Sequence, residues 1–332
     1  MSEQNSESMP AEGIPLVQHR ARILRFVRLA LAIGLVAIVI ALLWQQETRQ
    51  QFVTSLTSLS ITAMTGVLLL FILMRIAQAF SFKHALELSN RIIAFDASLA
   101  LVGIKGLFNL GFVGLGLAAQ TAHGKIAHHV PVRIMIHANL TQLFLLVVAL
   151  GLGLIAGIIL LPHASDIPGS MTFLLIGAGC AAMGLAGTVA CIFPSCSVWL
   201  NRIPGVQHLR LGMERPHGEP LRSLLLIACF QATTVVTRVT RVLVIAWSIS
   251  PDADFQTLAM SVLIADTVGV VPVTPGGIGL RELLIGMLGA AADQYEVFLA
   301  AAVIDRMAAI VLNLVHGALA TWQSGSESRT NQ

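Results

Sequence analysis

The chain has 332 residues, of which 56% are hydrophobic and 11% are charged, and its mean hydropathy is +0.82. Soluble domains carry about 25% charged residues, so this composition excludes them. The apolar residues come in blocks close to the ~20 residues that a helix needs to cross a bilayer. A formal net charge of only +3 gives no reason to expect a nucleic-acid partner. The sequence therefore predicts an all-α, polytopic membrane protein.

Six apolar blocks are long enough to be full membrane spans. In chain order, we expect these spans at Phe26–Trp44, Ile61–Phe80, Ile134–Leu161, Met171–Phe193, Leu221–Ile249 and Val297–Trp322. Two further apolar regions, Ile92–Ala119 and Leu258–Ala292, are interrupted by glycines or by a Pro-Gly-Gly turn and are predicted to be hairpins. In the first of them we expect Gly103 and Gly106 to be among the breaks. Residues 26–322 would then form one transmembrane domain between two polar tails, 1–25 and 323–332.

Basic residues indicate which side of the membrane each loop occupies. Arginines are dense before the first expected span and again between residues 202 and 222, whereas Arg49 is the only base in the loops expected on the other side. By the positive-inside rule, both termini are expected in the cytoplasm of a cell with the chain in its inner membrane. This assignment of loops and termini to the two sides of the membrane is consistent with six spans only if both hairpins re-enter the membrane rather than cross it.

The expected order of elements repeats. Residues 26–161 and residues 171–322 each read as span, span, hairpin, span, and the two halves begin on opposite sides of the membrane. This pattern predicts an inverted repeat, in which the two re-entrant hairpins meet near the middle of the bilayer and form a binding site.

The most informative motif lies in the second hairpin and reads Val273-Thr274-Pro275-Gly276-Gly277-Ile278-Gly279-Leu280-Arg281-Glu282. Irregular backbone at membrane depth is tolerated only where protein or a wet cavity covers it. In one interpretation, a helix that begins after Gly276 and Gly277 turns its free N–H groups and Arg281 toward an anion such as a lipid phosphate. In the other, the turn only reverses the chain, while Glu282 caps the amides and pairs with Arg281.

Two arginines within one span form a second candidate site. Arg238 and Arg241 are three residues apart and share a helix face. Arginine at that depth is costly and faces the protein interior or water. The pair is predicted either to bind an anionic headgroup or to form internal ion pairs with Asp266 or Asp305. For Asp266 we favour an ion pair over a protonatable coupling group.

Other polar residues of the apolar blocks are weaker candidates. Asp305 and Arg306 lie in the last span, where interhelical hydrogen bonding is the favoured interpretation. Lys105 is predicted either to pair with Asp96 across the turn of the first hairpin or to add a second positive charge at the midplane, and Asn109 is expected to line the same site. The third span carries His137, Asn139 and Gln142, which we expect to cross-link helices.

No metal, cofactor or catalytic constellation is expected. His123, His128 and His129 have no neighbouring cysteine or carboxylate ligands, and a basic loop facing solvent or headgroups is the favoured interpretation. Asp252 and Asp254 resemble paired metal-binding acids, but no nucleotide-binding motif accompanies them. The chain is therefore not expected to be an enzyme.

The second hairpin also resembles a known family. Pro275, Gly276, Gly277, Gly279 and Glu282, followed by Arg306 in the next span, are similar to the signature of the lysylphosphatidylglycerol synthase transmembrane-region family of flippase-like membrane proteins. The first hairpin departs from the family pattern, because the segment 108–116 has no carboxylate. No fused synthase domain is expected after Trp322.

The resemblance implies that the chain translocates an anionic lipid or a lipid-linked headgroup between leaflets, with membrane lipids as its partners. An alternative is a non-transporting scaffold for enzymes of lipid or glycolipid biosynthesis, and a membrane-embedded lipid-modifying enzyme is a third. No nucleotide-binding motif supplies energy, which leaves proton coupling through Asp266 or Asp305, or passive flipping.

Overall fold

A computed structural model describes residues 57, 59–110, 114–160, 170–192, 220–270 and 279–330, with side chains up to Trp322. Throughout these ranges the regular elements are α-helices, with no strand. Five of them are long and apolar enough to cross a membrane. They are α3 (Ile61–Glu87), α6 (Val132–Leu160), α7 (Ser170–Ile192), α9 (Pro220–Ile249) and α12 (Tyr295–Thr330). The prediction of an all-helical chain with several helices long and apolar enough to span a membrane is confirmed for the described residues.

Five of the six expected spans correspond to these helices. The expected first span, Phe26–Trp44, and the tail 1–25 lie outside the described residues. At the other end of the chain, α12 runs past Trp322 to Thr330, so the helix does not stop where its apolar stretch stops.

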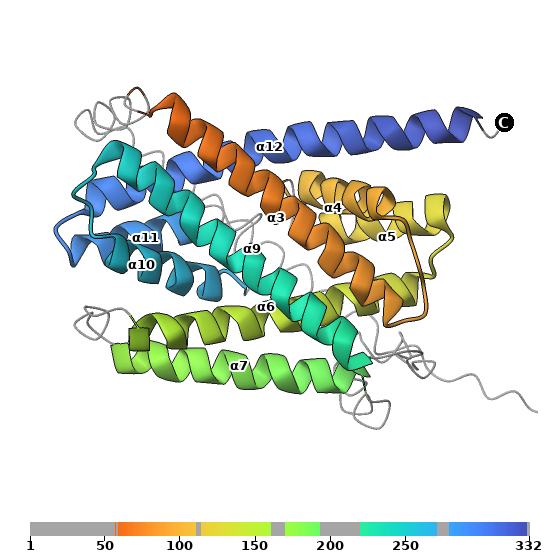
Figure 1. The fold of residues 1–332 in the computed structure, drawn as a ribbon, viewed down its shortest axis with the longest axis horizontal. Coiled ribbons are helices and arrows are strands. Elements are labelled where there is room, and N and C mark those ends of the chain that lie inside the picture. The colour runs from red at the N-terminus through yellow and green to blue at the C-terminus, as the bar shows by residue number, and fades with distance from the viewer. Residues whose placement is uncertain are drawn as a thin grey trace, which may run out of the picture.

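The long helices form two close pairs. In Figure 1, α3 and α9 run side by side along a diagonal, and α6 and α7 lie side by side along one edge, with α7 outermost. Small residues bring α6 and α7 together: a Cβ added to Gly151 would lie 2.5 Å from the carbonyl oxygen of Gly177. A Cβ on Gly184 would lie 2.6 Å from the carbonyl oxygen of Phe144. Small residues commonly permit such close backbone contact between membrane helices.

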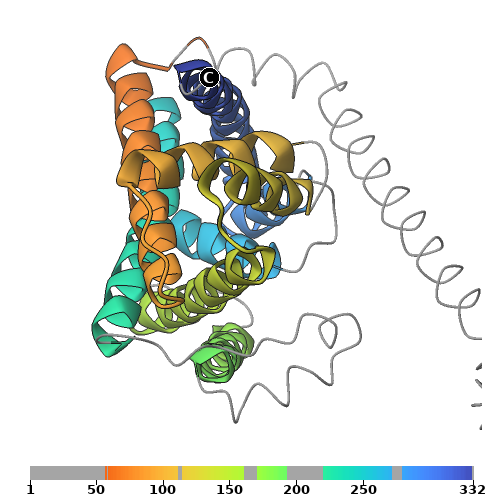
Figure 2. The same cartoon turned by 90° about the vertical axis from the view of Figure 1, so that its right-hand side faces the viewer.

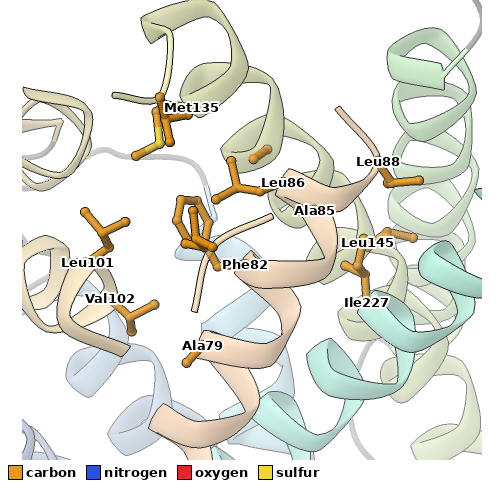
Figure 3. Packing of buried hydrophobic residues seen from close by; sticks show 13 residues of the cluster. Ala79, Phe82, Ala85, Leu86, Leu88, Leu101, Val102, Met135, Leu145 and Ile227 are labelled. Atoms are coloured by element: carbon orange, nitrogen blue, oxygen red, sulfur yellow. The ribbon is translucent and has the colours of Figure 1, made fainter. Parts of the chain in front are cut away.

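One apolar cluster joins the four helices α3, α4 (Phe95–Asn109), α6 and α9 (Figure 3). Phe82 and Leu86 of α3 are fully buried against Leu101, Met135 and Ile227. Ser81, the residue before Phe82, forms a polar cross-link. Its Oγ accepts hydrogen bonds from Gln142 Nε2 at 2.9 Å and from Gln231 Nε2 at 2.8 Å. The expectation that Gln142 cross-links helices is met, and α3, α6 and α9 are tied at one hydroxyl.

Four short helices form two pairs. They are α4 (Phe95–Asn109) with α5 (Leu115–His128), and α10 (Phe255–Val268) with α11 (Leu280–Ala290). A helix of 14 residues is about 21 Å long, less than the ~30 Å hydrocarbon core. The second helix of each pair follows a glycine with positive φ, 93° at Gly114 and 94° at Gly279. This backbone conformation is unfavourable for residues with a Cβ.

The two pairs occupy opposite ends of the molecule in Figure 1. Helix α4 packs along α12, and α10 packs along α6, so each pair contacts a long helix from the other half of the chain. The turns themselves, at residues 111–113 and 271–278, lie outside the described residues, and with them Pro275, Gly276 and Gly277.

The expectation that Gly103 and Gly106 break the first hairpin is wrong. Both lie inside α4, where they make room for side chains of α12: a Cβ on Gly103 would lie 3.1 Å from His316 Nε2. Because α4 is continuous, Asp96 and Lys105 stand about 13 Å apart along one helix and cannot pair across a turn.

Candidate functional site

A cavity of about 610 Å³ lies between the two short-helix pairs and is lined by residues of both. Asn109 and Leu110 reach it from the end of α4, Gly269 and Val270 from the end of α10, and Leu280 from the start of α11. The long helices α3, α6, α9 and α12 complete its wall. Segments far apart in the sequence therefore converge on one space.

More basic than acidic side chains line this cavity. Six are basic and two are acidic. The bases are Arg75, Lys105, Arg238, Arg241, Arg281 and Arg306, and the acids are Asp266 and Asp305. Apart from Arg75, the sequence had singled out every one of them. The structure brings them together from six different helices, and the sum of their charges favours an anion.

Asp305 is the centre of the most buried ion pairs. Arg241 Nε lies 2.8 Å from Asp305 Oδ1, and Arg241 Nη2 lies 3.2 Å from Asp305 Oδ2. Such two-point contacts between a guanidinium and a carboxylate are strong and directional. The Asp305 side chain is 3% exposed, and Arg281 Nη1 also approaches its Oδ2 at 3.4 Å. One carboxylate thus joins α9, α11 and α12.

Asp266 of α10 extends this network. It accepts a hydrogen bond from Arg281 Nε at 2.6 Å, and Arg238 Nη1 lies 3.8 Å from its other oxygen. Arg238 is the outermost member, with 31% of its side chain exposed. Three arginines and two aspartates therefore alternate across four helices, which corresponds to the ion-pair interpretation of these residues. We call this set of five residues the paired side of the cavity.

Glu282 has one of the two roles considered for it. Its Oε2 accepts a hydrogen bond from the backbone N–H of Gly279 at 2.7 Å, which caps the start of α11. The expected ion pair with Arg281 is not formed in the described part of the chain. Consecutive residues of a helix point about 100° apart, so Arg281 reaches Asp266 and Asp305 while Glu282 turns back to the helix start. An internal carboxylate thus already satisfies an amide that had been considered for an anion.

Arg75 and Lys105 line the same cavity, and we call these two residues the unpaired side. Arg75 Nη1 donates to Gln78 Oε1 at 2.8 Å, and its guanidinium lies 4.9 Å from the centre of the Phe71 ring. Lys105 Nζ donates to Asn139 Oδ1 at 2.5 Å. Among the described residues, no carboxylate lies within 4 Å of either cation.

Neutral polar residues position the unpaired side. Asn139 Nδ2 donates to Gln120 Oε1 at 3.0 Å, which fixes the amide that receives Lys105. Asn109 lines the cavity as expected, and its side chain lies against Gly116 where α4 and α5 are close. The remaining predicted site residue, Arg306, lines the cavity one position after Asp305.

Arg75 is the residue that sequence reasoning missed. It lies in the middle of α3 between Met74 and Ile76, inside the expected span Ile61–Phe80, and was not among the expected site residues. The signal was present, because a single arginine inside an apolar block is costly. Gln231 and Thr234 of α9 were also missed, although they precede Arg238 and Arg241 at helical spacing and line the same cavity.

In the described part of the chain, no group of three or more His, Cys, Asp or Glu side chains is arranged to hold a metal ion. No family model matches the chain, and no curated protein matches its sequence. The resemblance of the second hairpin to flippase-like proteins therefore rests on its motif residues alone.

Proposed function

We propose that this chain is a protein of the cell inner membrane that moves an anionic lipid headgroup between leaflets while the acyl chains remain in the bilayer. The observation that carries the proposal is the cavity, whose lining holds six basic side chains and two carboxylates. Isolated charge at membrane depth is costly, and it is retained where it serves a substrate path. An anionic headgroup would neutralise the excess.

The arrangement of the short helices supports a transport path. Both pairs are too short to cross the bilayer, both have a positive-φ glycine at the start of the second helix, and each packs against a long helix of the other half. We interpret them as the re-entrant hairpins of an inverted repeat with cytoplasmic termini. In such folds, rocking one half against the other exposes a central site to each side in turn.

The two aspartates have a supporting role in this proposal. Asp266 and Asp305 are each held by arginine at 2.6–2.8 Å, which favours fixing the guanidinium positions over carrying protons. Pro275, Gly276 and Gly277, which lie outside the described residues, resemble the turn motif of flippase-like proteins.

Filling the cavity tests this proposal without touching a charge. The purified protein is placed in liposomes, and leaflet exchange of fluorescent anionic and zwitterionic lipids is followed beside protein-free liposomes. In the test variant, Ala309→Trp, an indole enters the cavity that Ala309 lines. The matched control is Ala318→Trp on the exposed face of the same helix.

We expect the natural chain and Ala318→Trp to exchange anionic lipid faster than protein-free liposomes do, and Ala309→Trp to lose that exchange while remaining folded. If no lipid exchanges, with or without an ion gradient, transport is refuted and the scaffold interpretation is favoured. Exchange that survives in Ala309→Trp would place the lipid path outside this cavity.

A further inference from the structure

The arginines that line the cavity from α3 and α9, Arg75 and Arg241, differ in what their guanidinium edges contact. Arg241 uses its Nε–Nη2 edge to hold both oxygens of Asp305. The same edge of Arg75 has no partner in the described part of the chain, and its Nε is buried without a hydrogen bond. A buried donor of this kind costs free energy until an acceptor reaches it. The edge that meets an aspartate in one arginine has no hydrogen-bond partner in the other among the described residues.

Lys105 lies on α4, the helix that the guanidinium of Arg75 approaches. A Cβ added to Gly106, the residue after Lys105, would lie 2.9 Å from Arg75 Nη2, so the guanidinium approaches the α4 backbone at this point. The lysine ammonium is held by the neutral oxygen of Asn139 and keeps donors for another acceptor. Two cations from two helices thus converge on the cavity without a counter-charge.

We propose that Arg75 and Lys105 form the subsite for the phosphate of a phosphomonoester lipid headgroup, with Gln78 and Asn139 as positioning residues. A phosphomonoester carries close to two negative charges above its second pKa of about 6, which matches two uncompensated cations. A planar guanidinium edge suits two phosphate oxygens, and the ammonium adds a point charge. The inference deepens the proposed function and rests on it for the lipid nature of the ligand.

The paired side does not compete for this phosphate. Arg241 and Arg281 already hold Asp305 and Asp266, and an incoming anion would have to displace a buried carboxylate. The network therefore holds its own guanidiniums in place, while Arg75 and Lys105 bind the ligand. This division predicts selectivity by charge, with the phosphomonoester bound more tightly than a singly charged phosphodiester.

Binding to the full chain in detergent at pH 7 tests the subsite without requiring transport. The probes are short-chain phosphatidic acid, phosphatidylglycerol, phosphatidylcholine and inorganic phosphate, and the readouts are affinity and ligand-induced thermal shift. The variants are Arg75→Gln, Lys105→Met and the two combined, with Arg75→Lys as a conservative variant. Matched controls are Arg222→Gln on α9 and Lys125→Met on α5, both exposed.

We expect phosphatidic acid to bind best, each single variant to weaken it about tenfold, and the double variant about a hundredfold. Arg75→Lys should recover part of the affinity, and the controls should bind as the natural chain does. Equal affinity for phosphatidic acid and phosphatidylglycerol, or an unchanged affinity in the folded double variant, would overturn the subsite. Binding of inorganic phosphate alone, with the same dependence on the variants, would overturn the lipid assignment.

The two proposals fail in different ways. Tight, variant-sensitive binding in detergent together with no exchange in liposomes would refute translocation and leave the subsite standing. Exchange that is blocked by Ala309→Trp but unchanged in the Arg75→Gln/Lys105→Met variant would keep translocation and refute the subsite.

Discussion

Both sides of the cavity carry buried or half-buried cations, but only the cations of the paired side have carboxylate partners among the described residues. On the paired side, Arg241 and Arg281 share the buried Asp305, and every cation of the set has a carboxylate within 4 Å. On the unpaired side, Arg75 and Lys105 have only neutral partners among the described residues. The first arrangement is a closed network that holds four helices in place. The second is incomplete without an external anion, and it indicates where a ligand belongs.

The largest effect is expected from removing the shared carboxylate with Asp305→Ala. Two buried guanidiniums would lose their counter-charge, and breaking a buried pair in this way costs about 3–5 kcal/mol. Denaturant unfolding of the protein in mild detergent measures the loss. Arg241→Met combined with Asp305→Leu should recover part of it, because neither charge of that pair then remains. A loss below about 1 kcal/mol in Asp305→Ala would contradict the closed network.

A smaller effect is expected from Gly106→Ala, which acts on the unpaired side. The added Cβ would lie 2.7 Å from Asn313 Oδ1 and 2.9 Å from Arg75 Nη2. Both are ends of flexible side chains, so the helices stay packed while Arg75 moves from its position. We expect phosphatidic acid affinity to fall about tenfold with little loss of stability. Gly179→Ala is the control, since its Cβ would meet nothing within 4 Å. Unchanged affinity in Gly106→Ala would show that Arg75 does not need this position.

The smallest effect is expected from Arg238→Gln. This arginine is 31% exposed and stands 3.8 Å from Asp266, which Arg281 already holds at 2.6 Å. Removing it should cost less than about 1 kcal/mol, as for other exposed ion pairs. Unfolding midpoints compared with those of Arg281→Gln measure the contrast. If the two variants are equally destabilised, Arg238 belongs to the closed part of the network rather than to its edge.

Much of the candidate site could be predicted because charges are rare in this chain. An arginine or aspartate inside an apolar block is rare because burying its charge in the membrane costs free energy. Searching the apolar blocks for such residues found Arg238, Arg241, Asp266 and Asp305. The same criterion applied to Arg75 would have found it too. It was not selected, although it lies inside the expected span Ile61–Phe80.

Contacts between helices were the part that sequence reasoning could not supply. Whether Arg281 pairs with Glu282 or reaches Asp266 depends on the angle at which α10 and α11 meet, and adjacent residues give no information on that angle. The glycines of α4 illustrate the same limit, because Gly106 either breaks a helix or makes room for Asn313, according to what packs against it.

The sequence by itself determined the class of this protein, its long helices and the residues too polar for hydrocarbon. An apolar block near the bilayer length has few alternatives to a helix, because each backbone polar group must be satisfied within the segment. Only the tertiary structure decided which buried charges neutralise one another. Arg75 and Arg241 have similar sequence surroundings, but only Arg241 is placed beside a carboxylate from another helix. That placement depends on how the helices pack, and it leaves Arg75 and Lys105 as the cations open to a ligand.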